Sequence, residues 1–173
     1  MEDEEEDDED GVDLFEAYFD VRDRAVAVHE AGHAVVARAL GAEVLFVEID
    51  LTTGDGRSHS QNFVERVNNL AVCVAGCRAE HAFDARSSRR TKISDFRKMR
   101  KMLSELPEAD RRAARAEGYR LAEAMLREHA AKVQRLADLL MARRWKDGTD
   151  TVRIERDELN TVFGAARDEP NSR

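Results

Sequence analysis

Apolar residues at helical spacing run through most of this sequence, and that periodicity constrains the fold more than any other feature. Over residues 21–40 they recur every three or four positions, and Gly41 follows at a typical helix C-cap position. The same spacing predicts three further long helices, over residues 62–83, 94–106 and 108–145. We therefore expect a mostly α-helical chain.

One segment, residues 44–51, instead alternates with a period of two, as a half-buried β-strand does. Its two faces would carry Leu45, Val47, Ile49 and Leu51 on one side and Val44, Phe46, Glu48 and Asp50 on the other. We expect a turn after it, an extended segment at 151–154 and a last helix ending near Ala166. The signal for a second short strand, over residues 58–61, is weak. The expected fold class is mostly α with a small β-sheet.

Negative charge is concentrated at the start of the chain, where nine of the first ten residues are acidic. The remaining residues are nearly balanced in charge. Clustered carboxylates repel one another and have nothing to bury, so we expect a disordered acidic tail over residues 1–13. A single domain should follow over residues 14–166, with a frayed C-terminus over residues 167–173.

Several classes of protein are excluded by composition. The longest apolar run, residues 71–77, is far shorter than the roughly 20 residues that cross a bilayer, and the acidic start differs from a signal peptide. The two cysteines, Cys73 and Cys77, cannot form a disulfide framework and are better explained as small buried residues. We expect a cytoplasmic chain with no membrane span, and the acidic tail argues against nucleic acid as a partner.

The first predicted helix contains the pattern His29-Glu30-Ala31-Gly32-His33. Residues four apart lie on one helix face, so His29 and His33 can bind one metal ion, and zinc is the ion expected for this pattern. Glu30 would lie beside the open coordination position and act as general base for the attacking water. Gly32 weakens the helix by about 1 kcal/mol, which a second element passing close to the metal would explain.

A catalytic zinc site needs a third protein ligand. Spacing alone leaves three candidates open, namely Glu80, His81 and Asp95. We set His59 aside because it falls in an expected turn, and His129 because it falls in the distant C-terminal helix. Ser94 is expected to cap the helix that carries Asp95.

The sequence resembles the peptidase domain of FtsH-type ATP-dependent zinc proteases. The resemblance rests on VAVHEAGHAVV at 26–36, the strand from residue 43, AGCRAE at 75–80, Ser94-Asp95 and LAEAMLREH at 121–129. It implies a zincin-like FtsH peptidase-domain architecture, with His29, His33 and Asp95 as the metal ligands and Glu80 orienting a histidine. It also implies that an extended substrate adds to an exposed sheet edge, for which the strand at 44–51 is the candidate.

The resemblance implies a zinc-dependent metalloendopeptidase that hydrolyses peptide bonds in extended or unfolded polypeptides. Members of that family carry a membrane anchor and an ATPase module, whereas this chain has no GxxxxGK phosphate loop. A separate ATPase or a homo-oligomer is therefore the expected kind of partner. The alternative is a catalytically inactive, FtsH-peptidase-like binding or regulatory module.

A basic segment surrounds the proposed third ligand. Between Arg86 and Lys101 there are eight basic residues against Asp95 alone. A solvated loop and helix face explains this charge most simply. A sharper hypothesis is that the acidic tail docks on the basic segment and covers the cleft, in which case deleting residues 2–10 should raise activity at low salt.

Overall fold

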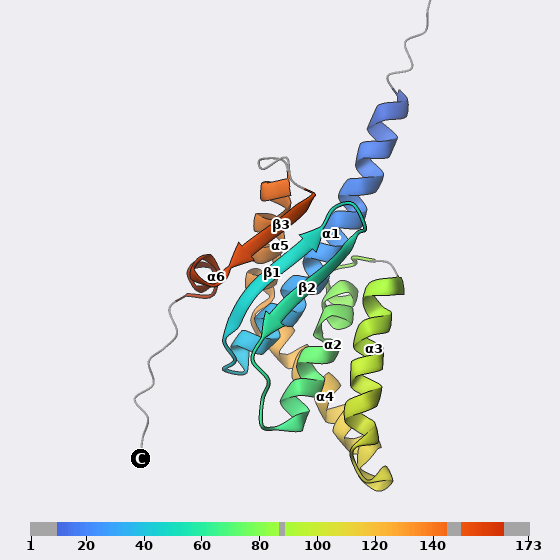
Figure 1. Ribbon diagram of the computed structural model, residues 1–173, viewed down its shortest axis with the longest axis vertical. Coiled ribbons are helices and arrows are strands. Elements are labelled where there is room, and N and C mark those ends of the chain that lie inside the picture. The colour runs from blue at the N-terminus through green and yellow to red at the C-terminus, as the bar shows by residue number, and fades with distance from the viewer. Residues whose placement is uncertain (1–9, 87–88, 145–149, 165–173) are drawn as a thin grey trace, which may run out of the picture.

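The computed structural model describes residues 10–86, 89–144 and 150–164 (Figure 1). The helices are α1 (Asp10–Ala39), α2 (Arg66–Ala82), α3 (Arg89–Ser104), α4 (Glu108–Glu128), α5 (Ala130–Arg144) and α6 (Arg156–Phe163). The strands are β1 (Val44–Asp50), β2 (Asp55–Ser60) and β3 (Thr151–Glu155). The prediction of a mostly helical chain with a small sheet is confirmed. The predicted disorder of residues 1–9 and the predicted fraying of residues 167–173 fall outside the described residues, whereas residues 10–13 of the expected acidic tail belong to α1.

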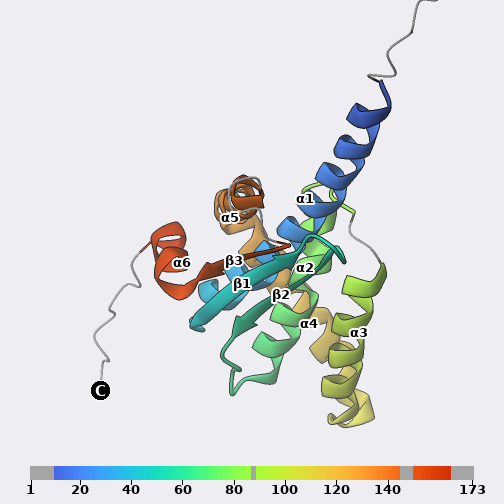
Figure 2. The same cartoon turned by 45° about the horizontal axis from the view of Figure 1, so that its top comes forward.

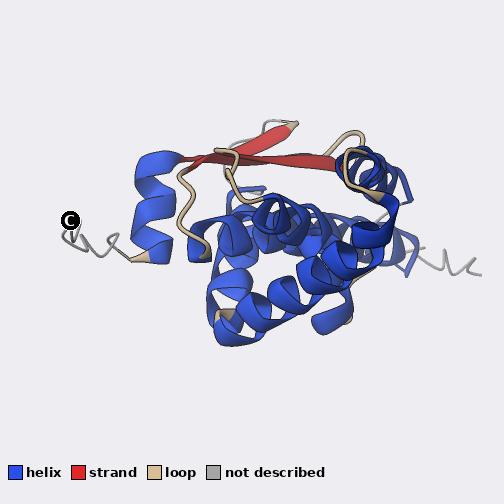
Figure 3. Cartoon of the chain, turned by 90° about the horizontal axis from the view of Figure 1, so that it is seen from below, coloured by secondary structure: helices blue, strands red, loops and turns tan. Residues whose placement is uncertain are grey.

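The three strands form one antiparallel sheet in the order β2-β1-β3. The sheet lies as a layer over the helices, with its other face open among the described elements (Figure 3). β3 shows this one-sided burial directly, because Val152 and Ile154 are buried while the residues between and beside them are exposed. The strand order places β2 at one edge of the sheet, where it lies beside α3 (Figure 2).

The structure corrects two expectations about β1. A register shift between Val44 and Phe46 turns the start of the strand, so that Val44 is buried in the core although strict alternation placed it on the same face as Phe46. β1 also pairs with a strand on each side. It therefore has no free edge to which a substrate could add, and the edge strand on the α3 side is β2.

α1 is the central helix and packs against α2 and α5. A Cβ on Gly32 would lie 2.5 Å from the Cβ of Ala79 and 2.9 Å from the carbonyl oxygen of Ala75, both on α2. A glycine is therefore needed where the two helices approach, which confirms the expectation of a close second element. On the α5 side, the buried Asp23 carboxylate of α1 pairs with Arg144 at 3.1 Å.

The starts of α1 and α3 differ from those expected. α1 begins at Asp10, not near residue 21, because residues 12–21 contain neither Gly nor Pro to end a helix. Its first turns extend beyond the body of the protein (Figures 1 and 2), and Tyr18 and Val21 there are exposed. α3 begins at Arg89, since arginine and lysine favour helix, so Asp95 lies in its second turn and Ser94 is not its cap.

The expected long helix of residues 108–145 is in fact two helices, α4 and α5, which are divided at His129. No Gly or Pro marks this division in the sequence. The break lets α5 turn back and pack on α1, a tertiary contact that the local pattern does not encode. No helix in the described part of the chain combines the length and the apolar character needed to span a membrane.

Candidate metal centre

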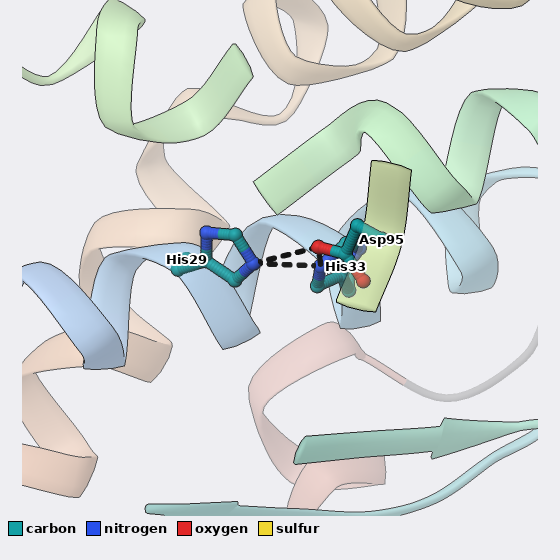
Figure 4. A group of neighbouring side chains, drawn as sticks. All are labelled: His29, His33 and Asp95. Atoms are coloured by element: carbon teal, nitrogen blue, oxygen red, sulfur yellow. Dashed lines mark hydrogen bonds and ion pairs between the residues drawn. The ribbon is translucent and has the colours of Figure 1, made fainter. Parts of the chain in front are cut away.

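Three buried polar side chains meet beneath the sheet, His29 and His33 from α1 and Asp95 from α3. The two Nε2 atoms are 3.0 Å apart, and each is 3.0 Å from Oδ2 of Asp95. Figure 4 shows the two rings and the carboxylate pointing toward one another. The histidine spacing alone predicted that the rings share a face, and the fold brings Asp95 to them across more than 60 residues of sequence.

Hydrogen bonds on the outer side of each ring fix which nitrogen faces the cluster. Nδ1–H of His33 donates to the carbonyl oxygen of Val72 at 2.6 Å, and Nδ1–H of His29 donates to Oε1 of Glu80 at 2.6 Å. Both acceptors lack a proton to give, so each neutral ring carries its hydrogen on Nδ1. Each Nε2 then presents a lone pair to the cluster, as a metal-binding imidazole does.

The donor set fits a metal ion. Two imidazole lone pairs and a carboxylate oxygen face one another with no donor among them, so a cation is needed to hold them together. Their 3.0 Å separations approach the roughly 3.4 Å between ligands of a tetrahedral ion with bonds of about 2.1 Å. Gly76 of α2 leaves the space for it, because a Cβ there would overlap Nε2 of both histidines.

The protonation of the metal-free cluster follows the same electrostatics. Burial opposes a charge on His29, but hydrogen bonds to Asp95 and Glu80 outweigh it and raise its pKa from 6.5 to about 9. Burial would raise the pKa of Asp95, but the two histidines hold it well below its usual range. The cluster therefore attracts positive charge, and a proton takes that place when no metal is bound.

The other candidates for third ligand lie elsewhere. Glu80 is buried but contacts the outer nitrogen of His29, the position expected for an orienting group. Its second oxygen, Oε2, pairs with Nζ of Lys92 at 2.7 Å. His81 is exposed on α2. Among the described residues, the group able to hold a metal consists of His29, His33 and Asp95.

Glu30 is buried beside the cluster and lines the same cavity as the two histidines. It lies under β2, since a Cβ on Gly56 would come within 2.6 Å of its Cγ. Burial is the main cause that raises the pKa of Glu30, and the neighbouring histidines oppose it. The raised pKa makes it easier for the Glu30 carboxylate to take up a proton.

A cavity of about 960 Å³ opens over the cluster, bounded by β2 on one side and by α2 and α3 on the other. His59 lines it from β2, with its ring stacked on Phe46 at a centroid distance of 5.5 Å. This position differs from the turn in which the sequence places His59. The signal that could have placed it is the short Ser58-His59-Ser60 strand, which is weak because it is polar.

Cys73 also borders the cavity, and its thiol donates a hydrogen bond to the backbone carbonyl of Asp95 at 3.0 Å. Burial raises the pKa of this thiol to about 12, so it stays neutral. The expectation that the cysteines are small packed residues holds for Cys73, and its hydrogen bond also ties α2 to the start of α3.

Comparison with protein-family models finds no match for this chain, and comparison with curated proteins finds no significant one.

Proposed function

We propose that the chain is an FtsH-like zinc metalloendopeptidase that hydrolyses peptide bonds in extended or unfolded polypeptides. One observation carries the proposal, the convergence of His29, His33 and Asp95 in a buried cluster that opens on a large cavity, with Glu30 beside it. The resemblance of the sequence motifs to FtsH-type peptidase domains and their zincin-like architecture supports the same function.

The chemistry needs a cation at the cluster, which would polarise the scissile carbonyl and lower the pKa of the attacking water. Glu30 accepts the proton of that water and passes it to the nitrogen of the leaving amine. Burial raises the pKa of Glu30, which makes its carboxylate a stronger base for that proton. Glu80 and the Val72 carbonyl hold the two imidazole rings in place throughout.

An extended substrate fits beside β2, the edge strand that lines the cavity. A peptide added to this edge would bond through its main chain, which accepts many sequences. Such binding requires an unfolded segment, because a folded substrate has its backbone groups already paired. We therefore assign β2, and not β1, the substrate-binding role.

The proposal is tested by metal content and by digestion of an unfolded protein. Wild type, Glu30→Gln, Asp95→Asn and Glu80→Gln are compared, with the exposed Glu65→Gln as matched control. Glu30→Gln should keep its metal and lose at least about 10²-fold in turnover, in the range of general acid–base catalysis. Asp95→Asn should lose the metal, while Glu80→Gln should bind it more weakly.

Two outcomes would change the assignment. Metal binding without turnover in any form, wild type included, would favour the inactive binding module. Loss of metal in Glu80→Gln but not in Asp95→Asn would overturn the ligand set. Reconstitution of the metal-free protein with zinc, cobalt, manganese or iron then identifies the ion that supports turnover.

A further inference from the structure

Two lysines form part of the cavity wall opposite β2. Asp95, Lys98, Met102 and Glu105 line the cavity at helical spacing, with Lys101 beside Met102. The side chain of Lys98 is 70% exposed, and its Nζ lies 3.8 Å from Oδ1 of Asp95. Lys101 is exposed and forms no ion pair with any described residue. Lys98 and Lys101 therefore present two solvated positive charges to a ligand that lies beside β2 in the cavity.

We propose that Lys98 and Lys101 select acidic side chains, so that the preferred ligand of the cavity is an extended acidic peptide. This inference rests on the proposed function for its binding mode along β2 and adds the substrate class to it.

The other charges of the cavity are largely balanced within the protein. Arg57 pairs with Glu48 at 2.7 Å, and Glu105 pairs with Arg66 at 3.4 Å. Glu30 and Asp95 belong to the candidate metal centre, where a bound divalent cation would offset their charge. Only Asp55 then opposes the two lysines among the charged residues that line the cavity.

Asp55 and Lys101 lie toward opposite ends of the cavity. β2 and α3 run in the same general direction in Figures 1 and 2, and Asp55 begins β2 whereas Lys101 is in the last turn of α3. The lysines therefore act on one end of a bound peptide, away from Asp55. The local excess of positive charge at the Lys101 end of the cavity attracts an acidic ligand, although the net charge of the whole chain is negative.

The helix geometry indicates which ligand residues would be selected. Lys98 and Lys101 follow Asp95 by about 4.5 and 9 Å along the axis of α3. An extended peptide advances about 3.3 Å per residue, so acidic side chains one to three residues from the scissile bond face the lysines. The selection is electrostatic and weakens as salt rises.

α3 also supplies a matched control. Arg97 and Arg100 are exposed on the same helix but do not line the cavity. The double variants Lys98→Glu/Lys101→Glu and Arg97→Glu/Arg100→Glu change the net charge of the protein equally. Only the first pair changes the charge of the cavity wall, so a difference between the two separates a local effect from general attraction.

The experiment measures fluorescence anisotropy of labelled ten-residue peptides on zinc-loaded Glu30→Gln protein, which cannot turn them over. The three probes carry four Glu, four Gln or four Lys in the same Gly-Ser-Ala background. We expect the Glu peptide to bind about tenfold more tightly than the Gln peptide at low salt, as two exposed ion pairs allow. Lys98→Glu/Lys101→Glu should remove or reverse this preference, whereas Arg97→Glu/Arg100→Glu should keep it.

Equal binding of the three peptides, or equal loss of the preference in both double variants, would overturn the inference. So would a single-stranded oligonucleotide that binds more tightly than the Glu peptide and depends on the same two lysines. Turnover by wild type is measured in parallel. A preference for the Glu peptide without turnover would support the inference and contradict the proposed peptidase activity. Turnover without that preference would support the peptidase activity and contradict the inference.

Discussion

At the scale of single residues, charged groups beyond His29, His33 and Asp95 surround the candidate metal centre. Lys92 contacts Glu80, Glu80 contacts His29, and His29 faces the cluster. The ammonium group of Lys92 is only partly exposed, so its charge acts on the buried carboxylate with little screening. Lys92 therefore has a specific partner, although the simplest explanation of the basic segment was a solvated loop and helix face.

Replacing Lys92 tests this chain of contacts. Lys92→Met removes the cation that stabilises the ionised Glu80, and we expect metal affinity to fall by roughly tenfold, the lower end for partners of a ligating histidine. Lys92→Arg should recover most of the loss. Affinity is measured by competition with a chromogenic chelator, with Lys101→Met as control on the same helix. An affinity unchanged in Lys92→Met would show that Glu80 needs no counter-charge.

The raised pKa of His29 predicts opposite pH dependences for two properties, the stability of the metal-free protein and its affinity for a metal ion. In the metal-free protein, the bound proton stabilises the fold fully below about pH 6.5 and ceases to do so as pH rises through about 9. Metal and proton compete for Nε2 of His29, so metal affinity should rise over the same range, by up to about tenfold per pH unit. Asp95 stays ionised throughout because its pKa is lowered.

Chelator competition and thermal unfolding of the metal-free protein, both followed from pH 6.5 to 9, measure the two trends. We expect rising affinity together with a falling melting temperature. A metal affinity that is flat over this range would mean that His29 carries no proton in the metal-free state.

At the scale of elements, the distance between α1 and α2 decides where the cluster forms. The contact at Gly32 brings α1 against Ala75 and Ala79, and α2 in turn supplies Val72 and Glu80 to the two rings. Separating the two helices would lengthen both outer hydrogen bonds at once. The glycine of the histidine motif therefore acts on the candidate metal centre through helix packing.

Gly32→Ala should destabilise the protein by about 1–3 kcal/mol, as overpacking does, and should also weaken metal binding. Gly32→Ala/Ala79→Gly removes the clash between the two Cβ atoms and should restore part of both losses. The 2.9 Å approach to the Ala75 carbonyl remains, so recovery should be incomplete. Denaturant unfolding and chelator competition on the four members of the cycle measure the coupling, and strictly additive effects would contradict a direct contact.

At the scale of the whole molecule, the length of α1 limits what the acidic tail can reach. Asp10 precedes His29 by 19 residues in one helix, or about 28 Å along its axis. The nine preceding residues span at most about 30 Å when fully extended. Docking of the tail over its own metal centre would therefore need nearly the full reach of the segment, whereas the cavity of a second molecule imposes no such limit.

We expect deletion of residues 2–9 to leave turnover unchanged in dilute protein. A synthetic peptide of residues 1–10 should inhibit both the full chain and the deleted one, more strongly at low salt than at high salt. Initial rates on an unfolded protein substrate at several enzyme concentrations measure this. A rise in activity on deletion that is independent of enzyme concentration would instead show docking within one molecule.

The sequence by itself determined the helical class, the half-buried β1 and the pairing of His29 with His33, because each depends on contacts between residues a few positions apart. It did not determine the division of α4 from α5 at His129 or the bulge near Val44. No local residue marks these features, and each is settled by packing against elements distant in sequence.

Only the tertiary structure decided the rest of the site. Spacing left Glu80, His81 and Asp95 equivalent as third ligand, and the resemblance selected Asp95 by analogy. The packing of α1, α2 and α3 places Asp95 against both Nε2 atoms and Glu80 against the outer nitrogen of His29. Sheet pairing likewise decides that β2 is the edge beside the cavity. The periodicity of the sequence indicates on which face of a helix or strand a residue lies. Which of these faces contact one another depends on how the whole core packs.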